Sequence, residues 1–293
     1  DEEAGVHRCS CTATSGTHTY RARHLHEFIV VSTMAFAGMT SDVGGRFIMR
    51  KASRLLSSMW DRQGRWFMPG LSLAALAKYG EGFDPVVVRR ARSWAHERQN
   101  LDGGWSWCPE GQFLDTALTV GCLGDLAGQQ VQTSISRAAT WIRARRSPER
   151  GWGQHIAAPP DADDTGAAVL ALVAAGSDGN DTDVCDALDF LCRSQNRNGS
   201  WGYPRHVGAN LSEDTAAATA ALMISSTQRH RSAAQRGIAW LLNHQQPDGS
   251  WATRWYVQPQ IACWRVVRAF RAAGMNPDAG PLVGVRIFQA QLA

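Results

Sequence analysis

Apolar and polar positions along the chain define two kinds of helix that alternate. One kind is small and apolar, as in 165–175, and the other is amphipathic with Arg and Gln on its polar face, as in 133–145. This periodicity, with almost no strand signal, predicts helices throughout. The expected pairs are 25–38 with 47–60, 71–79 with 85–99, 114–127 with 133–145, 165–175 with 183–195, 214–226 with 232–245, and 260–273 with 281–290.

A turn that contains Gly and Trp follows each pair except the last. The tryptophans recur at intervals of about 39 to 50 residues, a period typical of repeated supersecondary units. We expect each Trp to be buried between consecutive units while its indole N–H finds a partner. A Gln before most of these turns should cap them by hydrogen bonding. The tryptophans are Trp66, Trp105, Trp152, Trp201 and Trp251, and the glutamines are Gln63, Gln99, Gln195 and Gln245.

The helix pairs predict an all-α fold, an (α/α)6 barrel or toroid of six pairs joined by Gly-Trp (QW-type) turns. Helices crowded around an axis favour Ala, Gly, Ser and Thr, whereas outer helices face water and carry the charges. We expect residues 20–293 to form this single barrel domain. Residues 1–19 are expected to be an N-terminal extension that is disordered.

Composition narrows the class of protein. The chain is 44% hydrophobic with a net charge of +4, and no basic patch is interleaved with aromatics, which argues against nucleic-acid binding. No run reaches the ~20 apolar residues of a membrane span. A peripheral contact with a membrane surface is compatible with this composition. Seven cysteines without CxxC pairs, and an acidic start instead of a signal peptide, favour a cytoplasmic protein with reduced thiols and no metal site.

Three carboxylates within four residues, Asp161, Asp163 and Asp164, stand directly before an apolar helix. Locally this is typical of a helix N-terminus. The repeat, however, places the stretch on an inner helix, and Asp115 and Asp214 begin the neighbouring inner helices. These acidic helix starts should converge at the mouth of an apolar cavity. Because the carboxylates cannot all be ionised there, at least one pKa should be raised.

The acidic stretch 161–165, the turn 195–202, the block 212–214 and the block 246–255 together resemble the class II terpene cyclases. That family includes squalene-hopene, oxidosqualene and protonation-type diterpene cyclases, and the similarity is clear from about residue 70 onward. The resemblance implies that Asp163 is the general acid, oriented by Asp161 and Asp164. It also implies protonation of a terminal alkene of a linear polyprenyl substrate, farnesyl or geranylgeranyl diphosphate, which cyclises without losing its diphosphate.

Further pocket residues follow from this interpretation. Aromatic faces that stabilise the cation, or else ordinary core packing, are expected at Phe113, Trp255 and Tyr256. Arg205, His206 and Arg254 are candidates for binding the diphosphate, with solvated surface as the alternative. We expect no tightly bound cofactor, and Mg2+ only together with the substrate diphosphate.

The chain also departs from the family. Hopene cyclases carry a His that orients the acid where this chain has Ala218, and an aromatic where it has Leu114. The family normally pairs this barrel with a second one, and here there is room for one only. A second barrel could be missing, unnecessary, or replaced by the partner in a homodimer.

Two other functions compete with the cyclase. A protein prenyltransferase β-subunit uses a similar barrel and a zinc site with Asp-x-Cys on an inner helix. Asp183 and Cys185 have that spacing but open an outer helix. The second competitor is a non-catalytic helical toroid that binds a protein or a lipid.

Overall fold

The computed structural model describes residues 85–105, 112–124, 129–203, 211–254 and 260–275, and within these ranges the regular elements are all α-helices. The predicted all-α class is therefore confirmed. The helices expected at 25–38, 47–60, 71–79 and 281–290, and the extension 1–19, lie outside the described residues. The helices are α4 (Pro85–Glu97), α5 (Gln112–Leu123), α6 (Gln129–Arg143), α7 (Ala162–Ala174), α8 (Thr182–Ser194), α9 (Ser212–Leu222), α10 (Gln228–Asn243) and α11 (Gln260–Ala272).

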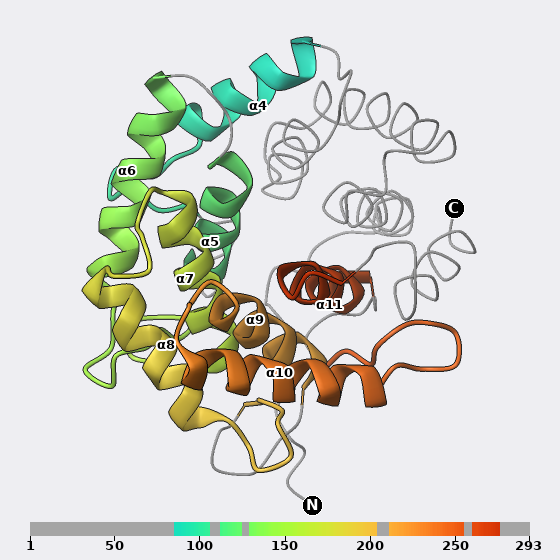
Figure 1. Cartoon of the computed structure of the whole chain (residues 1–293). Coiled ribbons are helices and arrows are strands. Elements are labelled where there is room, and N and C mark those ends of the chain that lie inside the picture. Colours follow the sequence, from blue (N-terminus) through green and yellow to red (C-terminus); the bar gives the residue numbers. More distant parts are fainter. Residues whose placement is uncertain (1–84, 106–111, 125–128, 204–210, 255–259, 276–293) are drawn as a thin grey trace, which may run out of the picture.

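These helices form an inner and an outer layer of an (α/α) barrel (Figure 1). α7 packs between α5 and α9 in the inner layer, and α9 in turn packs against α11. α4, α6, α8 and α10 follow one another around the outside, and the chain alternates between the layers. The alternation of small apolar and amphipathic segments in the sequence therefore corresponds to the alternation of layers.

Small residues let the inner helices approach one another closely. Every residue of α9 is buried. At Gly166 of α7, an added Cβ would lie 2.7 Å from the backbone carbonyl of Ala217 in α9. No side chain fits at that position without moving one of the two helices, because both contacts are to backbone atoms. The crowding predicted for inner helices is thus present between α7 and α9.

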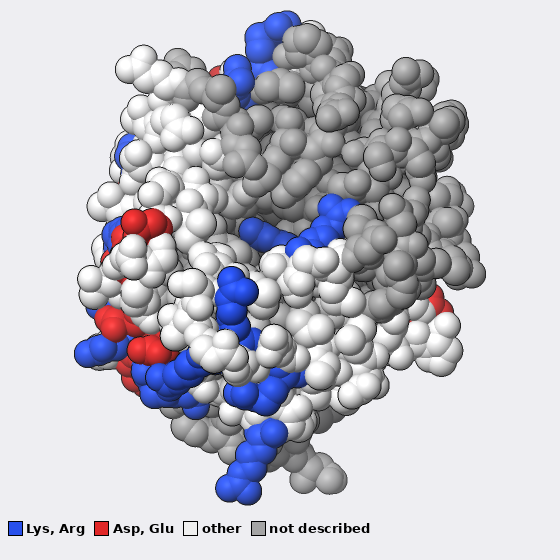
Figure 2. Space-filling model, viewed as in Figure 1, with Lys and Arg blue, Asp and Glu red and all other residues white. Residues whose placement is uncertain are grey.

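Charged side chains collect on the outer face, over α6, α8 and α10 (Figure 2). Arg143 at the end of α6 pairs with Asp181 and Asp183 at the start of α8, and Arg146 pairs with Asp183 and Asp186. These groups are partly exposed, so each pair adds only about 0–1 kcal/mol to stability. Their role is to tie successive outer helices together.

The Trp of each described Gly-Trp turn is a buried clamp. Its indole N–H donates to the backbone carbonyl ten residues earlier, near the end of the preceding outer helix. The donor–acceptor distances are 2.7–2.9 Å, and all four side chains are almost completely buried. This confirms the clamp predicted for these turns, which are those of Trp105, Trp152, Trp201 and Trp251.

The backbone of the same Trp is held by the next inner helix. The Trp152 N–H donates to the Thr165 hydroxyl at 2.9 Å, and that hydroxyl donates to the Trp152 carbonyl at 3.1 Å. The same two bonds join Trp105 with Thr116 and Trp201 with Thr215. At the fourth turn, Trp251 makes a backbone hydrogen bond to the Cys263 thiol instead. Each turn therefore fixes the start of the helix that follows it.

The predicted Gln caps are present at three turns. The side-chain amides of Gln99, Gln195 and Gln245 donate to the carbonyls of Gly103, Gly199 and Gly249 at 2.8–3.0 Å. Those glycines have φ between 85° and 101°, which a residue with a Cβ adopts only under strain. Gln63 lies outside the described residues.

The second described turn, which closes on Trp152, departs from this pattern. Arg150 occupies the position of the positive-φ glycine and itself has φ 72°. Its guanidinium pairs with Asp186 of α8. The turn therefore keeps the backbone conformation of the other three without their glycine.

Among the described helices, none has both the length and the hydrophobicity that crossing a membrane requires. The described cysteines Cys122, Cys185, Cys192 and Cys263 form no disulfide with one another. Burial raises the pKa of the Cys263 thiol to about 12, so this group stays protonated and acts as a core residue.

Replacing a clamp hydroxyl should destabilise the protein measurably. Thr165→Val leaves the buried N–H of Trp152 without its partner, while the Trp152 carbonyl keeps the backbone N–H of Asp161 as a donor. We expect a loss of about 1–3 kcal/mol in the free energy of unfolding. Thr140→Val on α6 is the matched control, since its hydroxyl bonds only to Ser136 on an exposed face. Urea titrations that give equal free energies for the two variants would contradict a role for the clamp in stability.

Candidate active site

The acidic stretch begins α7, and its three carboxylates have different surroundings. Asp161 is the N-cap, with its Oδ1 accepting the backbone N–H of Asp164 at 2.8 Å. The helix-start interpretation is therefore correct for this residue. Asp164 lies in the first turn with only 5% of its surface exposed. Its neighbour Thr165 is bonded to the Gly-Trp turn, which fixes the backbone of the whole stretch.

Asp163 alone of the three lines a cavity on the inner side of the ring. The space between the lining side chains is about 20 Å³, and apart from Asp163 and two arginines its wall is apolar. The lining comes from four inner helices, α5, α7, α9 and α11. The lining residues are Leu118, Asp163, Ala167, Leu170, Ala216, Ala217, Ala220, Trp264, Arg265 and Arg268.

The two carboxyls beside Asp163 in the acidic stretch have raised pKa values. Burial raises the pKa of Asp161 from 3.8 to about 6, although the N–H of Asp164 and the charge of Arg265 oppose the shift. Burial also raises the pKa of Asp164 well above its ordinary value, and the negative charges of Asp161 and Asp214 add to this shift. The raised pKa that clustering predicts is therefore found at both positions.

Arg265 of α11 forms an ion pair with Asp163 through its Nη1 and the Asp163 Oδ1. Only 5% of the Arg265 side chain and 14% of the Asp163 side chain are exposed. Burial and the neighbouring Arg268 lower the pKa of Arg265 to about 10, so it remains a cation at neutral pH. We missed both arginines from the sequence. The available signal was charge inside an otherwise buried helix, where Arg265 lies between Trp264 and Val266.

The acidic starts of the neighbouring inner helices lie where the repeat predicts. Asp214 is completely buried on α9 and acts electrostatically on Asp164. Asp115 is buried at the start of α5, which packs against α7. Glu213 has a structural role that we did not foresee. Its Oε1 accepts the Thr253 hydroxyl and, at 2.9 Å, the backbone N–H of Arg254, and it thereby holds the chain after the fourth turn.

Of the two interpretations given for Phe113, the structure favours ordinary core packing, and Phe113 does not line the described cavity. Its ring stacks on Trp141 and Trp152, with centroids 6.1 and 6.5 Å apart, in the hydrophobic core. It turns toward the outer helix α6, and Trp264 is the aromatic residue that lines the cavity.

Of the five remaining predicted site residues, the structure describes only Arg254. Arg254 is exposed, and its backbone N–H bonds to Glu213. Trp255, Tyr256, Arg205 and His206 lie outside the described residues.

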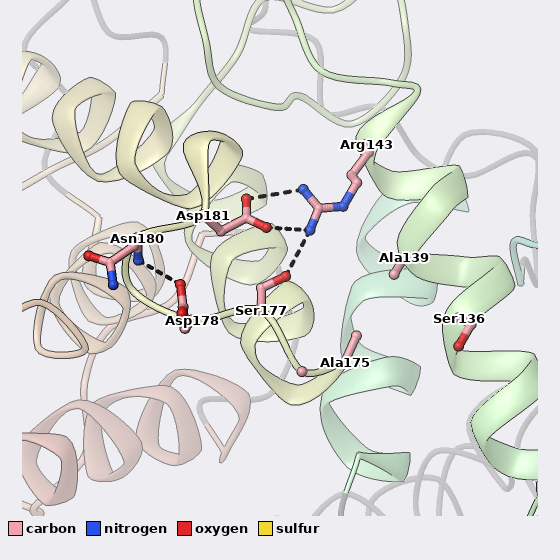
Figure 3. Close-up of a pocket in the computed structure, with 9 residues that line it drawn as sticks. Ser136, Ala139, Arg143, Ala175, Ser177, Asp178, Asn180 and Asp181 are labelled. Atoms are coloured by element: carbon pink, nitrogen blue, oxygen red, sulfur yellow. Dashed lines mark hydrogen bonds and ion pairs between the residues drawn. The ribbon is translucent and has the colours of Figure 1, made fainter.

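A larger hollow of about 550 Å³ lies on the outer surface between α6 and the α7–α8 turn (Figure 3). Arg143 crosses it and donates to Ser177 and to both carboxylate oxygens of Asp181. These bonds lower the pKa of Asp181 to about 2. Arg143 and Asp181 satisfy one another, Asp178 accepts the backbone N–H of Asn180, and none of the residues that line the hollow belongs to the acidic stretch. We therefore do not assign the hollow a catalytic role.

Asp183 and Cys185, the residues of the alternative zinc site, lie on α8 in the outer layer. Asp183 lies at the start of α8, as predicted, and pairs with Arg143 and Arg146. Across the ranges that the structure describes, no group of three His, Cys, Asp or Glu side chains is arranged to hold a metal ion.

Comparison with known proteins links this site to one family. The model of the squalene-hopene cyclase C-terminal domain matches residues 112–214 and 165–268. The chain is 28% identical to a squalene–hopene cyclase of Zymomonas mobilis, over 54% of this chain and 28% of that protein. It is 29% identical to a drimenyl diphosphate synthase of Streptomyces showdoensis, over 49% of this chain and 27% of that protein. The matches therefore span less than a third of these relatives.

Solved structures show the same fold. The type II terpene cyclase MstE from Scytonema superposes with a TM-score of 0.67 at 15% identity, and the match covers 85% of this chain and 89% of that protein. A variant of MstE was solved with geranylgeranyl dihydroxybenzoate, described as its substrate. At this identity the likeness concerns the fold alone.

The raised pKa of Asp161 predicts how stability depends on pH. Asp161→Asn keeps a good N-cap residue but removes the titration. Because the folded-state pKa is raised, the stability that Asp161 contributes is present near pH 4 and is lost as pH rises through 6. The variant should therefore gain stability relative to wild type between pH 4 and 7, measured as urea midpoints.

Asp248→Asn is the control for this measurement, because Asn198 stands at the equivalent position of another turn. Hydrogen bonds from Ser250 lower the pKa of Asp248, so its contribution is present at neutral pH and lost on acidification. The stability of the Asp248→Asn variant relative to wild type should therefore fall, or stay constant, from pH 4 to 7. The same upward trend in both variants would rule out the burial of Asp161 as the cause.

Proposed function

The chain belongs to the squalene-hopene cyclase C-terminal domain family, and from that premise we propose that it is a class II terpene cyclase. In this proposal it protonates a terminal alkene of a linear prenyl substrate. The observation that carries the proposal is the position of Asp163, which lines an otherwise largely apolar cavity while two protonatable carboxyls lie behind it. Clustered buried carboxylates of this kind signal functional sites.

The surroundings of the three carboxylates support Asp163 as the proton donor. Asp161 is occupied as the N-cap of α7, and Asp164 is buried behind the cavity wall. Asp163 has the only carboxyl of the stretch that lines the cavity. This argument depends on contacts alone and agrees with the role that the family resemblance implies for the middle residue.

The reaction starts with one proton transfer. The Asp163 carboxyl gives its proton to the terminal alkene, whose π electrons form the new C–H bond and leave a carbocation on the other carbon. Asp163 becomes a carboxylate at the N-terminus of α7, where the helix dipole stabilises it. The next alkene then attacks the cation. The small apolar residues of α7 and α9 exclude water, and the Trp264 ring offers a face to the developing charge.

The substrate class that we propose is a C15 or C20 prenyl diphosphate that keeps its diphosphate. A drimenyl diphosphate synthase among the relatives supports this choice. The sequence also lacks the Asp-Asp-x-x-Asp motif with which other terpene synthases ionise a diphosphate. Ligand pockets usually need about 300–1,000 Å³, which is far more than the described cavity holds. In this proposal the described cavity is therefore one end of a larger pocket, the end at which Asp163 lies. Mg2+ would accompany the diphosphate, with Arg205, His206 and Arg254 as candidate contacts.

A single barrel is sufficient in this proposal. The match to MstE covers 89% of that protein, so a cyclase of similar size has a comparable fold. A homodimer that closes the pocket remains a proposal, as does a cytoplasmic location.

Product analysis tests the function directly. Purified protein should convert farnesyl or geranylgeranyl diphosphate, with squalene as the third substrate tested, to a cyclic product at some pH between 5 and 8. The product should still carry its diphosphate by mass spectrometry, with Mg2+ present or absent as the comparison. Asp163→Asn should lower the rate by at least about 100-fold, the contribution of general acid catalysis.

Asp178→Asn, an exposed carboxylate on the α7–α8 turn, is the matched control and should keep its activity. Two outcomes would contradict the proposal. One is that none of the three substrates gives a cyclic product. The other is full activity of the Asp163→Asn protein. If the wild-type protein binds a prenyl ligand without turnover, a non-catalytic toroid is favoured instead.

A further inference from the structure

The ion pair between Asp163 and Arg265 places a cation directly on the proposed acid. Arg265 reaches Asp163 from α11, and 102 residues separate the two in the sequence. Both side chains are largely withdrawn from solvent, so solvent screens their interaction only weakly. A guanidinium is costly to bury without a partner. The Asp163–Arg265 ion pair is therefore a structural part of the cavity wall.

The other charged groups near the pair come from the surrounding inner helices. Asp161 and Asp164 stand beside Asp163 on α7, Asp214 faces Asp164 from α9, and Arg268 faces Arg265 along α11. Asp115 begins α5, the other inner neighbour of α7. The outer helices α6 and α8 also pack against α7. Arg143 of α6 pairs with Asp183 of α8, Arg146 just after α6 pairs with Asp183 and Asp186, and Asp189 of α8 pairs with Arg229 of α10.

A cation beside an acid has two opposite effects on proton donation. It stabilises the carboxylate, so a smaller fraction of the acid is protonated at a given pH. For the same reason each protonated acid is a stronger donor, because the carboxylate left after the transfer is already stabilised. Negative charge on Asp161, Asp164 or Asp214, when these groups are ionised, acts in the opposite direction. Arg265 is the charge in direct contact with Asp163 and should therefore decide the balance.

We propose that Arg265 is a positioning residue that strengthens Asp163 as a proton donor by stabilising its carboxylate. The inference rests on the proposed function of Asp163. Arg265 keeps its own proton throughout, and the only bonds that change are the O–H bond of Asp163, which breaks, and the C–H bond of the product, which forms. The same contact sets the pH above which the free enzyme loses activity.

The pH profile of kcat/KM, which reports the free enzyme, separates these effects. In Arg265→Gln the midpoint of the high-pH loss of activity should rise by about 1–3 pH units. The plateau rate at low pH should fall, because Asp163 is then a weaker acid, so the two profiles should cross. Partial unfolding of a variant lowers the height of the profile without moving its midpoint, so a merely structural role predicts no shift.

Two further variants serve as controls. Arg265→Lys keeps the charge and should stay close to the wild-type midpoint. Arg268→Gln removes the other cation that lines the cavity and should move the midpoint less than Arg265→Gln does. An unchanged midpoint in Arg265→Gln, or an equal shift in Arg268→Gln, would overturn the proposal.

Thermal unfolding tests the ion pair without turnover. Removing one partner of a buried pair leaves the other charge uncompensated. Asp163→Asn and Arg265→Gln together should therefore lower Tm by less than the sum of the two single losses. Additive losses would overturn the inference even in an active enzyme. Non-additive losses in a protein that forms no cyclic product would instead overturn the proposed function, and with it the acid-strengthening role, and would leave the ion pair as a structural contact.

Discussion

The hydrogen bonds between each Gly-Trp turn and the Thr of the next inner helix control the geometry of the acidic end of the barrel. In three repeats this Thr directly follows an aspartate, at Asp115, Asp164 and Asp214. When the turn binds the Thr hydroxyl, it fixes the backbone of the preceding carboxylate as well. The Trp indole N–H then anchors the turn to the outer helix behind it. The repeated clamp thus orients the carboxylates from behind, as supporting residues do in a preorganised site.

The clamp also shows why the sequence predicts the fold so well. The parts of the clamp are local, because Gln, Gly and Trp lie within seven positions of one another, as in Gln195–Trp201. Helix limits are less predictable. We expected α10 from residue 232, but it begins at Gln228, because a polar outer turn gives no apolar signal. α7 begins at Ala162, three residues before the apolar run, because Asp161 caps it through its side chain.

The contents of the cavity are harder to predict from the sequence than the fold. An inner helix is apolar on all sides, so periodicity does not show which residues face the axis. Phe113 and Trp264 are both aromatic residues on inner helices, yet one stacks in the core and the other lines the cavity. The pairing of Arg265 with Asp163 depends on the ring bringing α11 near α7, a long-range arrangement that no local pattern records.

In the proposed mechanism, the cavity wall combines a cluster of carboxylates that stays folded with an acid that can donate its proton. The raised pKa values of Asp161 and Asp164 reduce the negative charge that the acidic stretch carries. Arg265 compensates the charge where the cavity must remain open to a substrate, at Asp163. If Asp163 were protonated by burial alone, it would hold its proton too firmly to give it to an alkene. A neighbouring guanidinium lowers the cost of the carboxylate that forms, and the raised pKa values of Asp161 and Asp164 limit the negative charge beside it. In this proposal the raised pKa values and the proton release therefore belong to different members of one short acidic stretch.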